Sequence, residues 1–318
     1  MRIAVLDDYQ GVALTSADWS AVQARAEVVV FRELIEPAEL AVRLQSFDVV
    51  TLMRERTPMP GSLIAALPNL KLIITTGMRN ASVDVEAAAA RGIPVSGTQS
   101  LTNGAPEAAW ALILALARGV VAEDRSVREG GWQLEVGSSL SGRTLGILGL
   151  GRLGQMMATV GKAFGMPLLA WSQNLTAEKA AEHGAELASS LGDLMARSDY
   201  LTIHLILSAR TQGLIGAREL GLMKPTAYLI NTSRGPIVDE AALLAALAAG
   251  TIGGAGLDVY DQEPLPRDHP LRKAPRTVLL PHIGYVTQEN YALFYSQIVE
   301  DILAFLEGRP IRPVSPAA

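Results

Sequence analysis

Four histidines in the 318-residue sequence are the candidates for carrying a proton, because imidazole titrates closest to neutral pH. His183 lies in a polar stretch and His269 in a proline-flanked loop, so both are expected to be surface or turn residues. His204 ends an apolar run that is typical of a strand, where it would either contact a ligand or only close the strand. His282 ends a similar run, with a proline before it and a glycine shortly after it. This rigid setting makes His282 the best acid/base candidate.

Charged side chains also follow two other runs that are predicted to be strands. The segment NTSRG, residues 231–235, contains Arg234, whose guanidinium can hold a carboxylate through paired hydrogen bonds. The segment DVYDQEP, residues 258–264, follows the next strand and contains several carboxylates, among them Glu263. Each alone is more often an ordinary loop residue, but the carboxyl ends of parallel strands share one edge of a sheet. Three such ends that supply arginine, glutamate and histidine therefore predict an active site.

The glycine motif GLGRLG, residues 149–154, follows the strand TLGIL and opens a helix, which is the setting of a dinucleotide-binding turn. Gly149 would make the tight turn, Gly151 would let the backbone approach a pyrophosphate, and Gly154 would pack the helix on the strand. Arg152 and Leu153 complete the motif at the helix N-terminus, which faces the anion.

An acidic residue normally follows the next strand and binds the ribose 2′-hydroxyl of the dinucleotide. Here that strand ends in Ser172, Gln173 and Asn174, which are neutral, and no arginine directly follows it. The sequence therefore predicts weak discrimination, with NADP accepted at least comparably to NAD. The alternative is that Ser172 and Gln173 bind the ribose hydroxyls and that NAD is used normally.

The composition excludes several classes of protein. The net charge is −5 without a block of like charge, which argues against a nucleic acid or an anionic membrane as partner. The absence of cysteine excludes disulfides, thiolate nucleophiles and cysteine-ligated metals, and no metal site is predicted. No apolar run reaches the roughly 18 residues that a membrane helix needs, and the N-terminus does not resemble a signal peptide. We therefore expect a cytoplasmic protein.

Short apolar runs alternate with helical patterns along the chain, which indicates parallel β-α-β units. Strands are expected at residues 3–6, 28–31, 49–52, 72–75, 144–148, 168–171, 200–205, 227–231, 255–257 and 278–280. Helices are expected at residues 37–45, 62–66, 103–116, 154–164, 191–196, 240–249 and 288–306. The polar stretch Val121–Gly142 is interpreted as an arm or linker.

The order of four motifs resembles the D-isomer-specific 2-hydroxyacid dehydrogenase family, which includes glyoxylate and hydroxypyruvate reductases and phosphoglycerate dehydrogenases. GLGRLG, NTSRG, GLDVYDQEP and LLPHIG resemble the family's own stretches, and the likeness runs from about Leu70 to Gly284. The resemblance implies that the cofactor is NAD or NADP and that the catalytic trio consists of Arg234, Glu263 and His282. It also implies that Asp258 binds the carboxamide of the cofactor. Further cofactor contacts are expected from the glycine motif and from Ser172, Gln173, His204, Thr232, Ser233 and Gly284.

The segment TTGMRNASVD resembles the substrate-carboxylate loop of that family, and the resemblance places the backbone amides of Gly77 and Met78 at the substrate. Arg79 stands where a second glycine is common, so an extra cation would face the substrate. Together with Arg54 and Arg56 it would favour a second anionic group. The alternative is that Arg54 and Arg56 are solvated loop charges.

The implied fold consists of two doubly wound parallel-sheet α/β domains. A Rossmann cofactor domain, residues 101–285, is inserted in a flavodoxin-like substrate domain, residues 1–100 and 286–318. The implied reaction is reversible hydride transfer between the nicotinamide cofactor and a D-2-hydroxy acid/2-oxo acid pair, with the histidine as acid/base, the glutamate as its partner and the arginine on the carboxylate. The alternative function is a non-catalytic, dinucleotide-sensing scaffold of the corepressor type.

A homodimer with a two-fold interface is expected as the assembly. The arm Val121–Gly142 contains Trp132 among polar residues, and Trp110 and Leu114 lie on the adjacent predicted helix. An apolar, aromatic surface of this kind is often an interface. The alternative is that the arm folds back on its own domain.

Overall fold

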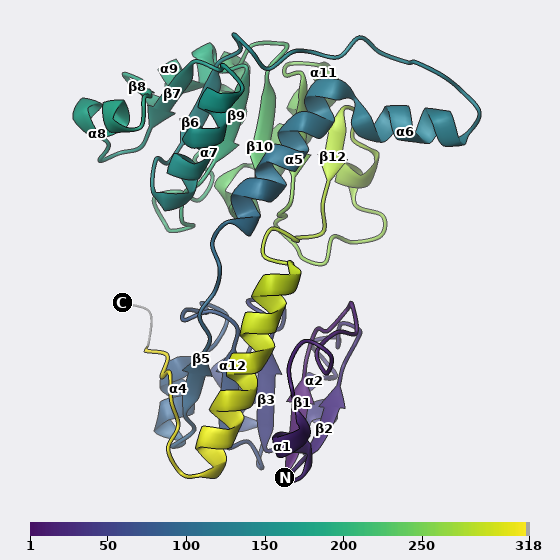
Figure 1. Ribbon diagram of the computed structural model, residues 1–318, viewed down its shortest axis with the longest axis vertical. Coiled ribbons are helices and arrows are strands. Elements are labelled where there is room, and N and C mark those ends of the chain that lie inside the picture. Colours follow the sequence, from purple (N-terminus) through teal and green to yellow (C-terminus); the bar gives the residue numbers. More distant parts are fainter. Residues whose placement is uncertain (316–318) are drawn as a thin grey trace. The chain divides into compact units, whose positions relative to one another are not determined.

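In a computed structural model, which describes residues 1–315, the chain folds into two compact units (Figure 1). Unit 1 comprises residues 1–101 and 286–318, and unit 2 comprises residues 102–285. All pairs of named strands in both sheets are parallel, and helices connect them. The predicted α/β class, with one parallel-sheet domain inserted in another, is therefore confirmed.

Unit 1 has a five-stranded sheet in the order β2-β1-β3-β4-β5, which is the flavodoxin-like order. Residues Val49–Leu52 and Leu72–Thr75 are buried at every position, which explains why they form continuous apolar runs in the sequence. The strands are β1 (Arg2–Val5), β2 (Glu27–Val30), β3 (Val49–Leu52), β4 (Leu72–Thr75) and β5 (Val95–Gly97). The helices are α1 (Ser20–Gln23), α2 (Leu40–Leu44), α3 (Gly61–Ala65), α4 (Val85–Ala90) and α12 (Gln288–Leu306).

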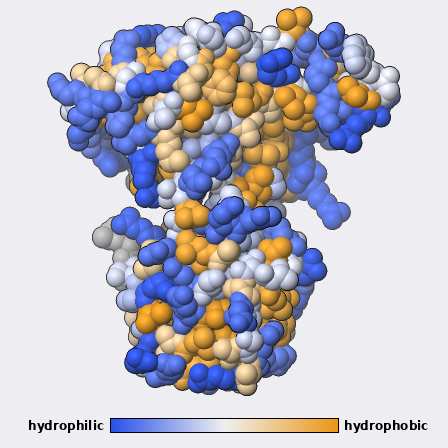
Figure 2. Space-filling view, viewed as in Figure 1, coloured by the Kyte–Doolittle hydropathy of each residue, from blue (hydrophilic) through white to orange (hydrophobic). Residues whose placement is uncertain are grey.

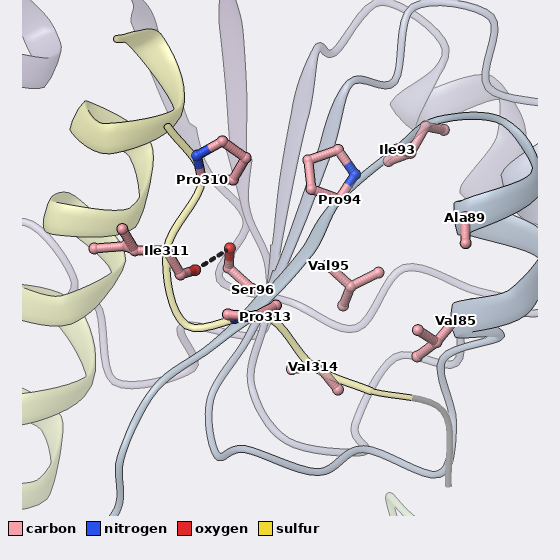
Figure 3. A pocket seen from close by; sticks show the side chains of 10 residues that line it. All are labelled: Val85, Ala89, Ile93, Pro94, Val95, Ser96, Pro310, Ile311, Pro313 and Val314. Carbon is pink, nitrogen blue, oxygen red and sulfur yellow. Dashed lines mark hydrogen bonds between the residues drawn. The ribbon is translucent and has the colours of Figure 1, made fainter. Parts of the chain in front are cut away.

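The segment after α12 lies along the edge strand β5 (Figure 3). Val314 donates its amide hydrogen to the Val95 carbonyl at 2.8 Å, and the Ser96 hydroxyl donates to the Ile311 carbonyl at the same distance. A cavity of about 200 Å³ lies beside this segment. Its lining is apolar apart from Ser96, so we do not assign chemistry to it.

Unit 2 has a seven-stranded sheet in the order β12-β11-β10-β9-β6-β7-β8, in which β6 to β11 follow the Rossmann order. The strands are β6 (Leu145–Leu148), β7 (Leu168–Trp171), β8 (Glu186–Leu187), β9 (Tyr200–Ile203), β10 (Tyr228–Asn231), β11 (Gly254–Leu257) and β12 (Thr277–Leu279). The helices are α5 (Gly104–Arg118), α6 (Val120–Arg128), α7 (Arg152–Ala163), α8 (Ala177–Glu182), α9 (Leu191–Arg197), α10 (Ala217–Leu222) and α11 (Glu240–Ala249).

Helix α5 packs on the sheet of unit 2 and ends at Gly119, whose positive φ of 61° closes the helix in the left-handed conformation. The helix α6 follows directly, so the first part of the predicted arm or linker, from Val121, is helical. Within the predicted arm or linker, the chain forms no helix or strand after α6, at residues 129–142 (Figure 1). Within residues 1–315, no single helix is both long and apolar enough to cross a membrane, whereas α5 and α6 together pass that test as a pair bent by 64°.

Candidate active site

The glycine motif forms a tight turn between β6 and α7. Gly149 has a φ of +100°, and its amide hydrogen is donated to the Trp171 carbonyl at 2.9 Å, which ties the turn to the end of β7. A Cβ atom on Gly149 would lie 2.7 Å from the His204 carbonyl oxygen, so the end of β9 also confines this turn. Glycine is required here by both the backbone conformation and the close approach.

The other two glycines of the motif differ in their surroundings. A Cβ atom on Gly154 would overlap the carbonyl oxygen of Gly149, so this glycine lets α7 pack against the turn. Gly151 has no atom within 4 Å of the place where a Cβ would lie. It precedes α7 without a side-chain cap, and Arg152 and Leu153 begin that helix. The open backbone at the helix N-terminus fits the pyrophosphate of a dinucleotide.

We expect Gly154→Ala to act mainly on stability and Gly151→Ala mainly on dinucleotide binding. The first should lower the free energy of unfolding by about 1–3 kcal/mol, because the methyl group overpacks the turn. The second should lower it by less than about 1 kcal/mol but weaken dinucleotide binding about tenfold or more, roughly 1.4 kcal/mol. Urea denaturation and calorimetric titration measure the two quantities. Equal unfolding free energies, or unchanged dinucleotide binding by the Gly151 variant, would contradict this assignment.

The turn that follows β10 carries Arg234. The buried Asn231 side chain accepts a hydrogen bond from the Ser233 amide at 3.0 Å and donates one to the Arg234 carbonyl at 2.9 Å. The Ser233 hydroxyl donates to the Leu205 carbonyl. Thr232 is buried, and its hydroxyl has no hydrogen-bond partner among residues 1–315. A buried, unpaired hydroxyl in this turn fits a position that a bound dinucleotide would satisfy.

Gly235 brings this turn against the segment that follows β11. A Cβ atom on Gly235 would overlap the carbonyl group of Tyr260, so only glycine allows the two backbones to meet. Glu263 lies in the same segment as Tyr260. The close approach of Gly235 therefore places the arginine turn beside the segment that contains the glutamate.

The histidine and the glutamate form a hydrogen-bonded pair. His282 Nδ1 lies 2.5 Å from Glu263 Oε2, while Glu263 Oε1 accepts the amide hydrogen of Tyr260 at 2.9 Å. The Tyr260 hydroxyl donates to the Leu280 carbonyl at 2.8 Å, which joins the ends of β11 and β12. The His282 ring also meets Tyr285 edge-on at 5.5 Å between ring centres. Both partners are held from more than one side.

Asp258 fixes the backbone that directly follows His282. The two carboxylate oxygens of Asp258 accept the amide hydrogens of Ile283 and Gly284 at 2.7 and 2.8 Å, and His282 itself has a positive φ of 54°. Burial raises the pKa of Asp258, and these two hydrogen bonds oppose that shift. The Asp258 side chain thus shapes the histidine loop, a structural role in addition to the predicted contact with the cofactor.

His204 is less suited to proton transfer. Burial lowers the pKa of His204 to about 4, so its imidazole is neutral near neutral pH. Its Nε2 lies 2.9 Å from the hydroxyl of Thr202 on the same strand. These contacts fit a residue that ends β9 beside the glycine turn.

The predicted substrate residues Gly77, Met78, Arg79 and Arg54 lie in unit 1. Gly77 has a φ of +89°, and its amide hydrogen is donated to the Thr98 hydroxyl at 3.0 Å. This amide is therefore already used, which leaves that of Met78 as the candidate for a substrate carboxylate. Met78 and Arg79 are both exposed.

Arg54 and Arg56 are both half-buried, so each is only partly solvated. Arg54 has a positive φ of 55°, and its carbonyl accepts a hydrogen bond from Asn80 at 2.7 Å. Its guanidinium lies over Gly77, where an added Cβ would overlap it. Arg56 instead donates to the Asp7 carbonyl at 2.9 Å. Arg54 is thus directed to the predicted carboxylate loop, while Arg56 supports the end of β1.

Several residues that support the site were not identified from the sequence. Tyr260, Asn231 and Thr98 act through hydrogen bonds to atoms of other loops, which the local pattern does not encode. Arg210 is a further example, because it lies 37 residues from its partner Gln173. The only available signal was that Tyr260 and Asn231 lie within the motifs that also contain Glu263 and Arg234.

Comparisons with known proteins place the chain in one family. Residues 110–284 match the family described as D-isomer specific 2-hydroxyacid dehydrogenase, NAD binding domain. A glyoxylate reductase from Aeropyrum pernix is 43% identical over 257 residues, which are 78% of this chain and 76% of that protein. A D-3-phosphoglycerate dehydrogenase from Mycobacterium tuberculosis is 38% identical over 81% of this chain and 49% of its own length.

Solved structures with the same fold cover nearly the whole chain. A crystal structure described as a putative D-3-phosphoglycerate dehydrogenase oxidoreductase from Ralstonia solanacearum has a TM-score of 0.93. Its sequence is 34% identical, and the alignment covers 99% of this chain and 97% of that one. The likeness therefore includes both units.

Proposed function

Because this chain belongs to the D-isomer specific 2-hydroxyacid dehydrogenase family, we propose that it interconverts a 2-oxo acid and a D-2-hydroxy acid with Arg234, Glu263 and His282 as its catalytic residues. Membership makes it an oxidoreductase that acts on CH–OH donors with a nicotinamide cofactor. The observation that carries the assignment of residues is the His282–Glu263 hydrogen bond of 2.5 Å, formed by loops after β11 and β12. We assign unit 2 to the cofactor and unit 1 to the substrate.

When bound, the nicotinamide cofactor would supply a hydride to the carbonyl carbon of the 2-oxo acid, or accept it from the same carbon of the 2-hydroxy acid. In the reducing direction, His282 gives a proton to the carbonyl oxygen. Since Nδ1 of His282 is hydrogen-bonded to Glu263, Nε2 is the nitrogen left for this transfer. The Glu263 carboxylate stabilises the imidazolium form, and Arg234 pairs with the substrate carboxylate and polarises the carbonyl group.

The dinucleotide would be held by the glycine motif, by Thr232 and by the residues that end β7 and β9. We keep Asp258 and Gly284 as proposed cofactor contacts. Their hydrogen bond also shapes the loop that carries His282. We propose that NADP is accepted at least comparably to NAD, because Ser172 and Gln173 end β7 without a carboxylate.

A substrate panel tests the activity. The purified protein should oxidise NADPH or NADH, followed by nicotinamide absorbance, with at least one of glyoxylate, hydroxypyruvate, pyruvate and longer 2-oxo acids. The alternative function, a dinucleotide-sensing scaffold, predicts binding of the cofactor without turnover of any of them. The preformed His282–Glu263 pair favours the enzyme, because a scaffold has no need of a proton carrier.

Arg54→Gln should raise the KM for every 2-oxo acid that is turned over by about tenfold or more. The Arg54 guanidinium lies over the carboxylate loop, where it could bond the substrate carboxylate. A charge-assisted hydrogen bond of this kind is worth about 1.5–3 kcal/mol. The value of kcat should change less. Steady-state kinetics with two substrates measures both constants. The control is Arg43→Gln, an exposed arginine on α2 that pairs with Glu33 and Glu39 and lies over the Phe31 ring, none of which belongs to the carboxylate loop. An unchanged KM would refute the role of Arg54.

We also propose that the protein is a homodimer. Three large apolar side chains on the loop after α6 are exposed, namely Trp132, Leu134 and Val136, at 73%, 59% and 101%. Figure 2 shows apolar residues among hydrophilic ones in this part of unit 2. Trp110, which was expected to extend this surface, is instead buried against Phe164 at 5.3 Å between ring centres. The interface would therefore be formed by the loop and α6.

Light scattering at micromolar concentration should give twice the chain mass of 33.7 kDa. Val136→Asp should shift the protein toward the monomer, because it buries a charge in the interface. Val42→Asp is the matched control, an exposed valine on α2 in unit 1. A monomeric mass for the unmodified protein would refute the dimer.

The proposed location of the protein is the cytoplasm, since a chain without cysteine is compatible with a reducing compartment.

A further inference from the structure

We infer that Arg210 binds the 2′-phosphate of NADP and makes NADP(H) the preferred cofactor. This inference rests on the proposed function, because it assigns a residue to the cofactor site of that reaction. It starts from one contact that the structure forms between distant parts of unit 2. Arg210 Nη1 donates a hydrogen bond to Gln173 Oε1 at 3.2 Å, across 37 residues of sequence.

Gln173 lies where Rossmann folds recognise the ribose 2′ position, at the end of the strand after the glycine turn. The end of β7 is fixed to that turn by the hydrogen bond from the Gly149 amide to the Trp171 carbonyl. Beyond it, the Leu175 amide donates to the Ser172 carbonyl at 3.1 Å and forms a turn. The side chain of Gln173 is exposed on this turn.

Arg210 reaches this place from the opposite side of the glycine turn. Strands β7 and β9 lie on either side of β6, and Arg210 belongs to the loop that follows β9. The Thr211 hydroxyl donates to the Ile206 carbonyl at 2.7 Å and accepts the Ser208 amide hydrogen at 2.8 Å. These bonds close residues 206–211 into a turn that contains Arg210. The arginine thus starts from a fixed backbone although its side chain is exposed.

The charges at this place favour a phosphate over a hydroxyl. Arg210 donates to a neutral amide rather than to a carboxylate, so its positive charge is not neutralised by this partner. A guanidinium offers paired donors that match phosphate oxygens. Because Gln173 Oε1 accepts from Arg210, the amide nitrogen of Gln173 is left as a further donor. The side chains that end β7, Ser172, Gln173 and Asn174, carry no negative charge to repel the phosphate.

Arg210→Gln tests the inference in two assays. Calorimetric titration compares the binding of 2′,5′-ADP and 5′-AMP, which differ only in the 2′-phosphate. Steady-state kinetics with one 2-oxo acid compares kcat/KM for NADPH and NADH. The unmodified protein should have a higher kcat/KM with NADPH than with NADH. In the variant, kcat/KM for NADPH and the affinity for 2′,5′-ADP should each fall about tenfold or more. Its values for NADH and 5′-AMP should stay within about twofold. Arg218→Gln, an exposed arginine on α10 that pairs with Glu219, should change none of these values.

Three other outcomes separate the inference from the proposed function. Turnover with the same ratio of NADPH to NADH in the variant and the unmodified protein would overturn the role of Arg210 alone. A preference of the unmodified protein for NADH would also overturn it. Binding of 2′,5′-ADP that depends on Arg210, without turnover of any 2-oxo acid, would support this role and overturn the proposed activity.

Discussion

His282→Asn is expected to lower kcat by about a hundredfold to ten-thousandfold while the protein stays folded. The proton carrier is removed, and the Tyr260 amide, which is the other hydrogen-bond partner that Glu263 has among residues 1–315, cannot take its place. Asparagine is the appropriate replacement because His282 has a φ of +54°, a conformation that asparagine tolerates better than most residues. The backbone hydrogen bonds from Ile283 and Gly284 to Asp258 do not involve the imidazole, so the loop should keep its shape.

The measurement is kcat with the best substrate of the panel, together with the affinity for the cofactor and the melting temperature. Those last two should be close to the values of the unmodified protein. Glu263→Gln provides a graded comparison, because it keeps a hydrogen-bond acceptor beside Nδ1 but removes the charge, and its loss should be smaller. Near-normal turnover by His282→Asn would rule out His282 as the acid/base.

Arg234→Lys should lower kcat/KM for the 2-oxo acid about a hundredfold, or about 2.7 kcal/mol at 1.36 kcal/mol per factor of ten. Lysine keeps the charge but loses the paired donors that grip a carboxylate. The Arg234 guanidinium donates to the Ser233 carbonyl at 2.8 Å, but the turn should survive without that bond, because Asn231 holds it through the Ser233 amide and the Arg234 carbonyl.

Steady-state kinetics with the preferred cofactor checks this prediction. Arg267→Lys, an exposed residue in the loop after β11, is the control and should behave like the unmodified protein. If Arg234→Lys keeps the normal kcat/KM, the arginine neither binds the carboxylate nor polarises the carbonyl group. A loss of cofactor binding without a change in substrate affinity would assign it to the dinucleotide instead.

The sequence alone was sufficient to determine the fold class and the strand ends from which the candidate site is built. Strands of a parallel sheet are buried on both faces, so β3, β4 and β6 form continuous apolar runs. The glycine motif was equally readable, because a tight turn, an open backbone and close helix packing each demand glycine at a fixed local spacing. The pairing of His282 with a carboxylate followed from the rule that parallel strands end at one edge.

Contacts between loops were decided only by the tertiary structure. Three such contacts join separate loops: Gly235 with Tyr260, the Gly77 amide with Thr98, and Arg210 with Gln173. The sequence spacing of these pairs follows no regular repeat, so it could not predict the contacts. Helix α6 and the buried Trp110 were missed for a related reason, since a polar surface helix and a linker have similar compositions and burial depends on the neighbours. Local spacing determines which residues lie at a strand end, but the folding of loops over one another determines which of them meet.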